Sequence, residues 1–199
     1  MSTAPPGTSP ESGHPLRRRI LDLLGRYQPE SPAEAADVGR VCALAAGPAD
    51  PWLRSTPCHV TASALIVYPG SRRVLLRWHQ RQQAWLQVGG HADPGECDPL
   101  GIALREAAEE TGLTDLVPWP DAQVRHVVIV PVPASSTEPA HQHADLRFVL
   151  ATQSPGTARA ERPDAPLRWL SLPEAGAATS EANLRETLSR VGRLLGEHA

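Results

Sequence analysis

Three glutamates, Glu106, Glu109 and Glu110, stand close together in the segment Arg105–Leu113. On an α-helix their spacing of three and four residues would place all three carboxylates on one face. Like charges held that close repel one another unless a cation lies between them. Carboxylate oxygens are the ligands that Mg²⁺ and Mn²⁺ prefer, and Mg²⁺ commonly takes substrate phosphates as further ligands. The run therefore predicts a helix that binds a divalent cation, against the simpler reading of a solvated charged face.

The helix that would carry these glutamates has recognisable ends. Asp98 is a favourable N-cap, Pro99 fits the first helical position, and Gly112 fits the residue just past the end. A glycine-rich loop, Gly89–Glu96, comes shortly before it and follows an apolar segment at 84–88. A strand, a glycine-rich turn and an acidic helix together predict a site for a metal and a phosphate. We expect the apolar stripe of the helix to consist of Leu100, Leu104, Ala107 and Ala108.

Residues Gly90–Leu113 resemble the Nudix box, G-x5-E-x7-R-E-U-x-E-E-x-G-U, in which U is a bulky aliphatic residue. A pattern with this many fixed positions is much more specific than a short motif. Eight residues rather than seven separate Glu96 from Arg105, so either Glu96 or Asp93 could brace that arginine. Ala107 stands where a larger aliphatic residue is usual. The positions that match the pattern are Gly90, Glu96, Arg105, Glu106, Glu109, Glu110, Gly112 and Leu113.

The resemblance implies a metal-dependent hydrolase of a nucleoside diphosphate linked to another moiety. It assigns the metal, Mg²⁺ or Mn²⁺, to Glu106, Glu109 and Glu110, and it gives Arg105 the task of orienting a glutamate. The general base in such enzymes is a box glutamate, for which Glu109 is the candidate, or a carboxylate from a later loop, a place that Glu161 and Asp164 occupy here, with Glu161 taken as the candidate. Nucleoside triphosphates, ADP-ribose and nucleotide sugars all remain open as substrates. The rival reading is a Nudix-like module that binds a nucleotide without hydrolysing it.

The residues expected to contact the substrate are Gly89, Gly90, His91, Arg77 and Arg147. All 19 basic residues are arginines, so phosphate contacts must come from arginine, metal or backbone amides. A surface role is the default for any arginine. His91 could contact a phosphate or simply cap a turn.

A histidine pattern lies further along the chain. His141, His143 and Asp145 alternate, so in an extended segment they share one face. They could form a second metal centre or contact the substrate, because imidazole is a common ligand of zinc and other transition metals. We favour a polar loop that leads into an edge strand, since no further Cys or His has matching spacing.

Composition places limits on the partners. The net charge of −3 suggests no nucleic-acid footprint, and no stretch of the 199 residues is long and apolar enough to span a membrane. Three scattered cysteines indicate neither a disulfide framework nor a zinc motif, which predicts a cytoplasmic protein. The expected partner is a small nucleotide or diphosphate substrate.

The hydrophobic pattern predicts three regions: a disordered tail at 1–14, a helical extension at 15–58 and a Nudix domain at 59–199. The extension contains predicted helices at 15–27 and 32–46, which could cover the core, shape the pocket or form a homodimer contact. Within the domain we expect an α/β/α sandwich with a mixed sheet, which is also the fold that the resemblance implies. Its predicted strands span 59–68, 73–79, 84–88, 123–132, 145–152 and 167–170, and its helices span the acidic segment and 180–196.

Overall fold

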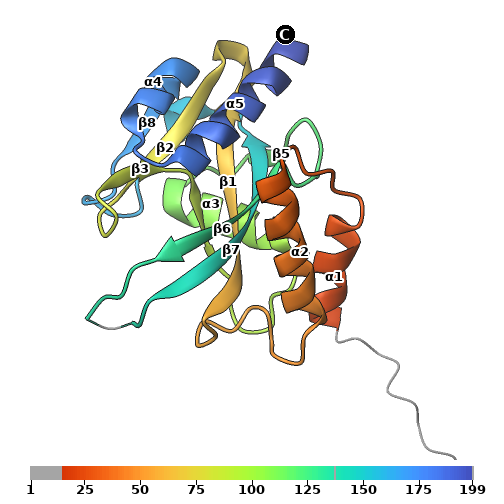
Figure 1. Cartoon of the computed structure of the whole chain (residues 1–199). Coiled ribbons are helices and arrows are strands. Elements are labelled where there is room, and N and C mark those ends of the chain that lie inside the picture. Colours follow the sequence, from red (N-terminus) through yellow and green to blue (C-terminus); the bar gives the residue numbers. More distant parts are fainter. Residues whose placement is uncertain (1–14, 137, 199) are drawn as a thin grey trace, which may run out of the picture.

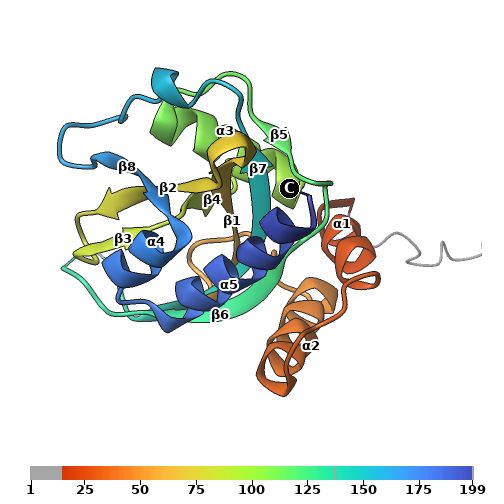
Figure 2. The same ribbon diagram turned by 90° about the horizontal axis from the view of Figure 1, so that it is seen from above.

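The computed structural model describes residues 15–136 and 138–198, so the disordered tail predicted at 1–14 lies outside the described residues. Figures 1 and 2 show a sheet with helices on both sides. The elements in chain order are α1 (Pro15–Leu24), α2 (Pro32–Ala46), β1 (Cys58–Tyr68), η1 (Pro69–Ser71), β2 (Arg73–His79), β3 (Ala84–Leu86), β4 (Val88–His91), α3 (Pro99–Thr111), β5 (Val117–Pro118), β6 (His126–Val132), β7 (His141–Ala151), η2 (Pro155–Thr157), β8 (Leu167–Ser171), α4 (Leu172–Ala178) and α5 (Ala182–Glu197).

The long strands β1 and β7 form the centre of the sheet. They run parallel, with His59 opposite His143 and Ser63 opposite Arg147. Every other strand pair is antiparallel: β2 and β4 pair with β1, β5 and β6 pair with β7, and β3 and β8 pair with β2. The mixed sheet that we predicted is therefore confirmed.

The two faces of β1 support two separate hydrophobic clusters. Because successive side chains of a strand point to opposite faces, Ala62 and Ile66 pack with α1, α2 and α3, whereas Leu65 and Val67 pack with α4 and α5. Helices on both faces give the α/β/α sandwich, and α1 and α2 precede it as predicted. We call these the α3 face and the α5 face below.

Helix α3 is positioned by its buried side. Ile102, Ala103 and Ala107 are fully buried against the sheet, whereas Leu100 and Leu104 are only half-buried. The predicted apolar stripe was therefore partly wrong: Ala107 is buried as expected, but the sheet covers Ile102 and Ala103 in place of Leu100 and Leu104. The helix ends as predicted, since Gly112 takes the left-handed conformation with φ 66°.

Strand β7 begins at His141, four residues earlier than the predicted strand. It pairs on one side with β1 and on the other with β6, so it is a central strand. The prediction of a polar loop leading into an edge strand was wrong here. A segment rich in polar residues favours a loop when only the sequence is considered. In the structure, backbone hydrogen bonds to β1 and β6 keep this segment extended.

The N-terminal helices attach to the domain through a buried ion pair. Ser31 caps α2 by accepting a hydrogen bond from the Glu34 N–H. Both Arg190 nitrogens Nη1 and Nη2 donate to Glu34, at 2.8 and 2.9 Å, and Tyr27 donates to the same carboxylate. The Val127 N–H on β6 also donates to it. Burial opposes ionisation of Glu34, but these donors outweigh it and lower its pKa to about 2.

We expect Glu34→Gln to cost about 3–5 kcal/mol of unfolding free energy, because it leaves Arg190 buried without a counter-charge. The Glu34 contribution should be complete above pH 4.5 and disappear as the pH falls toward 2, since folding lowers its pKa. Urea unfolding from neutral to acidic pH measures both effects. Glu186→Gln is the matched control, because Glu186 also binds Arg190 but is half exposed, and it should cost less than about 1 kcal/mol. Equal losses in the two variants would contradict this account.

Candidate active site

Arg105 connects the loop after β4 to the acidic face of α3. Its Nε lies 3.0 Å from Glu96 Oε1 and its Nη2 lies 2.9 Å from Glu96 Oε2. Its Nη1 donates to Glu106 at 3.1 Å and to Glu109 at 3.0 Å, and Nη2 also donates to the His91 carbonyl at 2.8 Å. One guanidinium therefore orients two of the helical glutamates and holds the loop beside them.

The extra residue before Arg105 leaves the brace intact. Glu96 makes three hydrogen bonds to Arg105, whereas Asp93 approaches its Nε only to 3.8 Å. Of the two alternatives, Glu96 is thus the brace. The Asp93 N–H donates to Glu96 at 2.8 Å, which fixes the carboxylate from the loop side.

Two glycines of β4 lie against the carboxylates of Glu110 and Glu106. The Gly89 N–H donates to Glu110 Oε2 at 3.1 Å. Any side chain at Gly90 would overlap the carboxylate of Glu106. Gly89 itself has φ 149° and lies against Ser63 of β1, with no room for a side chain. The glycine-rich strand therefore leaves the space in which Glu106 and Glu110 come together.

Burial makes negative charge unfavourable at these carboxylates. The side chains of Glu106 and Glu110 are only 16% and 14% exposed. Burial raises the pKa of Glu106, and it raises the pKa of Glu110 to about 7 although Arg77 lies nearby and opposes the shift. A bound divalent cation would favour the charged forms of both, so the donor set fits a hard oxygen-binding metal.

The remaining residues predicted for catalysis lie around the same cluster. Arg77 on β2 is buried and contacts Glu110 at 3.2 Å and Glu161 at 3.4 Å. Glu161 comes from the loop before β8, and its side chain is half exposed. Glu109 is 55% exposed and bound to Arg105. Two arginines thus connect the predicted catalytic and metal carboxylates: Arg105 binds Glu106 and Glu109, and Arg77 binds Glu110 and Glu161.

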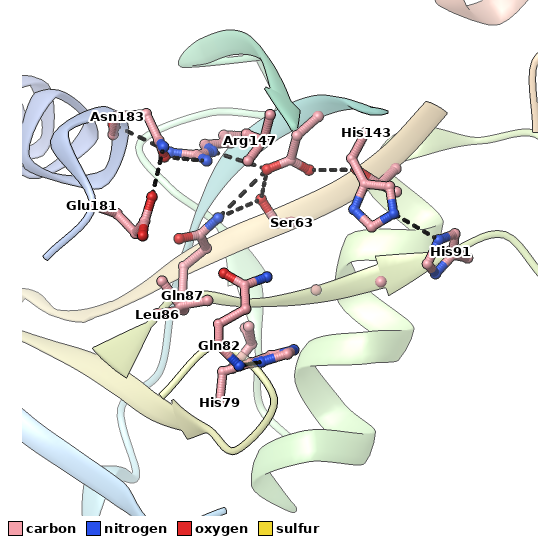
Figure 3. A pocket seen from close by; sticks show the side chains of 16 residues that line it. Ser63, His79, Gln82, Leu86, Gln87, His91, His143, Arg147, Glu181 and Asn183 are labelled. Carbon is pink, nitrogen blue, oxygen red and sulfur yellow. Dashed lines mark hydrogen bonds and ion pairs between the residues drawn. The ribbon is translucent and has the colours of Figure 1, made fainter. Parts of the chain in front are cut away.

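A cavity of about 240 Å³ lies along the other predicted substrate residues (Figure 3). Gly89, Gly90 and His91 border it, and so does Arg147. The three box glutamates are not among its lining residues; Glu106 and Glu110 approach the same two glycines from α3. Its polar lining includes side chains that sequence reasoning did not single out: Thr61, Ser63, His79, Gln82, Gln87, Glu181 and Asn183.

Arg147 is fixed on the wall of this cavity. It is 3% exposed, and it donates to Asp145 at 2.9 Å and to the Asn183 side chain at 2.7 Å. Asp145 also accepts from Thr61 at 3.0 Å and from Ser63 at 2.8 Å. The alternation of His141, His143 and Asp145 was visible in the sequence, but the partners of Asp145 and Arg147 on β1 and α5 were not.

Comparison with known proteins shows the family. A sequence model described as the NUDIX domain matches residues 57–191. The fold is also similar to that of a C. elegans Ap4A hydrolase (TM-score 0.56, 20% identity, covering 69% of this chain and 98% of that one). A Nudix-family hydrolase from Clostridium perfringens is similar at TM-score 0.53 and 22% identity, covering 71% of this chain and 98% of that one. The dihydroneopterin triphosphate pyrophosphohydrolase of E. coli is similar at TM-score 0.51 and 19% identity, covering 66% of this chain and 92% of that one.

The chain belongs to the Nudix family, and the prediction of a Nudix hydrolase is confirmed. No match is found among proteins of curated function. Over the part of the chain that the structure describes, no helix combines the length and apolar character needed to cross a membrane.

We expect Gly90→Ala to remove most activity while the protein stays folded. The new methyl group displaces the Glu106 carboxylate, whose far end can move without disturbing the core. Hydrolysis rates and thermal unfolding measured side by side would separate the two effects. The matched control is Gly39→Ala on an exposed part of α2, where no atom lies near the added methyl group. This variant should keep full activity, and its free energy of unfolding should rise by up to about 1 kcal/mol. Full activity in Gly90→Ala would show that the position of Glu106 is unimportant.

The raised pKa of Glu110 predicts how stability depends on pH without divalent cations. Because folding raises this pKa from 4.5 to about 7, the folded state gains stability from the protonated form below pH 4.5 and loses it as the pH rises through 7. Glu110→Gln cannot titrate there. As the pH rises from 5 to 8, the unfolding free energy of this variant should therefore increase relative to that of the parent by up to about 3 kcal/mol. Urea unfolding in a chelator tests this, with the exposed Glu197→Gln as control; a constant difference across the range would refute it.

Proposed function

We propose that this protein hydrolyses a diphosphate linkage in a nucleoside diphosphate linked to another moiety, with Mg²⁺ or Mn²⁺ as its cofactor. The candidate substrates are nucleoside triphosphates, ADP-ribose and nucleotide sugars. The observation that carries the proposal is the pair Glu106 and Glu110, half-buried side by side against Gly89 and Gly90, where burial raises both pKa values.

The metal would be held by Glu106 and Glu110, with Glu109 beside them on the exposed side of α3. When bound there, a divalent cation neutralises phosphoryl charge and lowers the pKa of the attacking water. The protein supplies the geometry: Arg105, braced by Glu96, orients Glu106 and Glu109. Losing this arginine would leave the carboxylates free to separate.

Arg77 is the candidate phosphate contact on this side of the sheet. Its buried Nε has no hydrogen-bond partner within the described residues, and an unsatisfied donor of this kind costs free energy unless a ligand binds it. An anionic phosphate oxygen is a natural partner for a guanidinium. This supports the predicted role of Arg77 beside Glu110.

Two carboxylates are candidates for the general base. Glu109 is half exposed and held by Arg105, and Glu161 is half exposed and lies 3.4 Å from Arg77. Either can approach a water at the edge of the cluster, which is the first requirement of a general base. Glu161 comes from a loop and can therefore adjust when substrate binds.

The cavity on the α5 face is the candidate site for the nucleoside. Its Gln82, Gln87 and Asn183 side chains offer both donors and acceptors, which suits the edge of a base or a sugar. The cavity and the carboxylate cluster share Gly89 and Gly90. A nucleotide in the cavity could thus reach the cluster with its phosphates at the edge of β4.

The alternative is a module that binds nucleotides without hydrolysing them. A pure binding function has no need for three carboxylates on one helix face with an arginine that orients them. The retention of Glu106, Glu109 and Glu110 favours the enzyme.

The direct test is turnover of a nucleotide panel with Mg²⁺ or Mn²⁺. The panel should also contain Ap4A and dihydroneopterin triphosphate, for which two structurally similar proteins are named. We expect metal-dependent hydrolysis of at least one diphosphate compound, and a loss of about two or more orders of magnitude in Glu110→Gln. Glu197→Gln, an exposed carboxylate on α5, should be unchanged. Tight binding without turnover across the panel would support the binding module, and equal rates in Glu110→Gln would remove Glu110 from the mechanism.

A further inference from the structure

Four histidine rings meet at one end of the central strands. His59 is the second residue of β1, His91 is the last of β4, and His141 and His143 are the first and third of β7. The Nε2 atom of His91 lies 3.0 Å from that of His59 and 3.2 Å from that of His143, whose Nε2 is 3.1 Å from that of His141. Nitrogen atoms of His59, His141 and His143 all lie within 4.8 Å of one another. Figure 3 shows His91 and His143 turned toward each other.

Backbone carbonyls determine the tautomers of the two outer rings. His59 Nδ1 lies 3.1 Å from the Thr56 carbonyl, and His141 Nδ1 lies 2.9 Å from the Pro139 carbonyl. A carbonyl only accepts, so each Nδ1 carries the proton and each neutral ring has a lone pair on Nε2. Both lone pairs are directed at the other histidines. A second ring nitrogen bound to a backbone carbonyl is also the usual support of a metal-ligating histidine.

Hydrogen bonds alone cannot satisfy this arrangement. The contacts run from His59 to His91 to His143 to His141, and each needs one N–H and one lone pair. His59 and His141 both present a lone pair. If His91 and His143 each carry a proton on Nε2 to donate outward, these two protons face each other. If either inner ring lacks that proton, its lone pair faces the lone pair of the outer ring beside it. At least one of the three contacts is therefore unfavourable. A cation among the rings removes the conflict, because it can accept a lone pair from every Nε2.

Three of the six nitrogen–nitrogen separations among the four rings can be compared with those of a small tetrahedral site. With Zn–N bonds of about 2.0–2.1 Å, the nitrogens of a tetrahedral site are about 3.3 Å apart. The three observed separations of 3.0, 3.2 and 3.1 Å are close to this value. Burial lowers the pKa of His91 to about 3 and that of His143 to about 4, with smaller contributions from neighbouring histidines, so both rings are neutral at pH 7. Neutral imidazole is the form that binds metals.

We propose that His59, His91, His141 and His143 bind one divalent transition-metal ion, of which zinc is the first candidate. The ligands are all imidazole nitrogens, which suit zinc and its neighbours, whereas the box offers carboxylate oxygens, which suit magnesium. The ion would join β1, β4 and β7 at one point. It would also fix the loop after β4, because the His91 carbonyl accepts from Arg105.

The test uses the untagged full chain after removal of metals with a chelator. Zinc affinity and stoichiometry are measured by competition with a chromogenic chelator, and Co²⁺ binding is followed by visible absorption, which separates four-coordinate from six-coordinate sites. We expect one equivalent of zinc, a four-coordinate Co²⁺ spectrum and a zinc-dependent rise in melting temperature. The double variant His141→Ala and His143→Ala should bind zinc at least about 100-fold more weakly.

Two controls make the outcome decisive. His198→Ala, an exposed histidine at the end of the chain, should bind zinc as the parent does. Glu106→Gln with Glu110→Gln should also keep the zinc site, although it removes the box carboxylates. Unchanged zinc affinity in the double histidine variant, loss of zinc in the double glutamine variant, or a six-coordinate Co²⁺ spectrum would each overturn the proposal. If the double variant does not fold, His141→Gln at the half-exposed start of β7 replaces it, and the parent Co²⁺ spectrum still decides.

Discussion

The structure depends on keeping two half-buried carboxylates close to each other. Burial is the largest cause of the raised pKa of both Glu106 and Glu110. Nearby carboxylates add to it: Glu106 raises the pKa of Glu110, and Glu109 raises that of Glu106. Several parts of the fold hold them in place: Arg105 on the same helix, the Gly89 N–H on β4 and Arg77 on β2. The buried Ile102, Ala103 and Ala107 keep α3 against the sheet so that its acidic side faces β4. Such local strain is common where binding energy is to be gained from a ligand.

The sequence predicted the box site in detail because its parts are close in the chain. Helix propensity, caps and a long motif determine where Glu106, Glu109, Glu110 and Arg105 lie relative to one another. The brace by Glu96 also formed despite the extra residue, since the loop can adjust before Pro99. Arg77 and Glu161 joined the cluster only through the pairing of β2 and the loop before β8, which no local pattern specifies.

The α5 face was harder to predict because its contacts are long-range. The parallel pairing of β1 with β7 places Ser63 beside Arg147 and His59 beside His143. These residues are about 84 positions apart, so their spacing carries no motif. The alternation of His141 and His143 is visible in the sequence, but the other two histidines of the cluster, His59 and His91, lie on β1 and β4. Only the sheet register brings these strands to the same place.

Strand β4 separates two kinds of site at a distance of one residue. Gly90 faces α3, where Glu106 occupies the space of its side chain, while the His91 side chain lies on the other face among the histidines. Successive side chains of a strand must point to opposite faces, so this short strand borders the box carboxylates on one face and the four histidines on the other. Arg105 connects them, because it binds Glu106 through Nη1 and the His91 carbonyl through Nη2. The hydrogen bonds of Arg105 thus join the end of β4, where His91 meets the other histidines, to the carboxylates of α3.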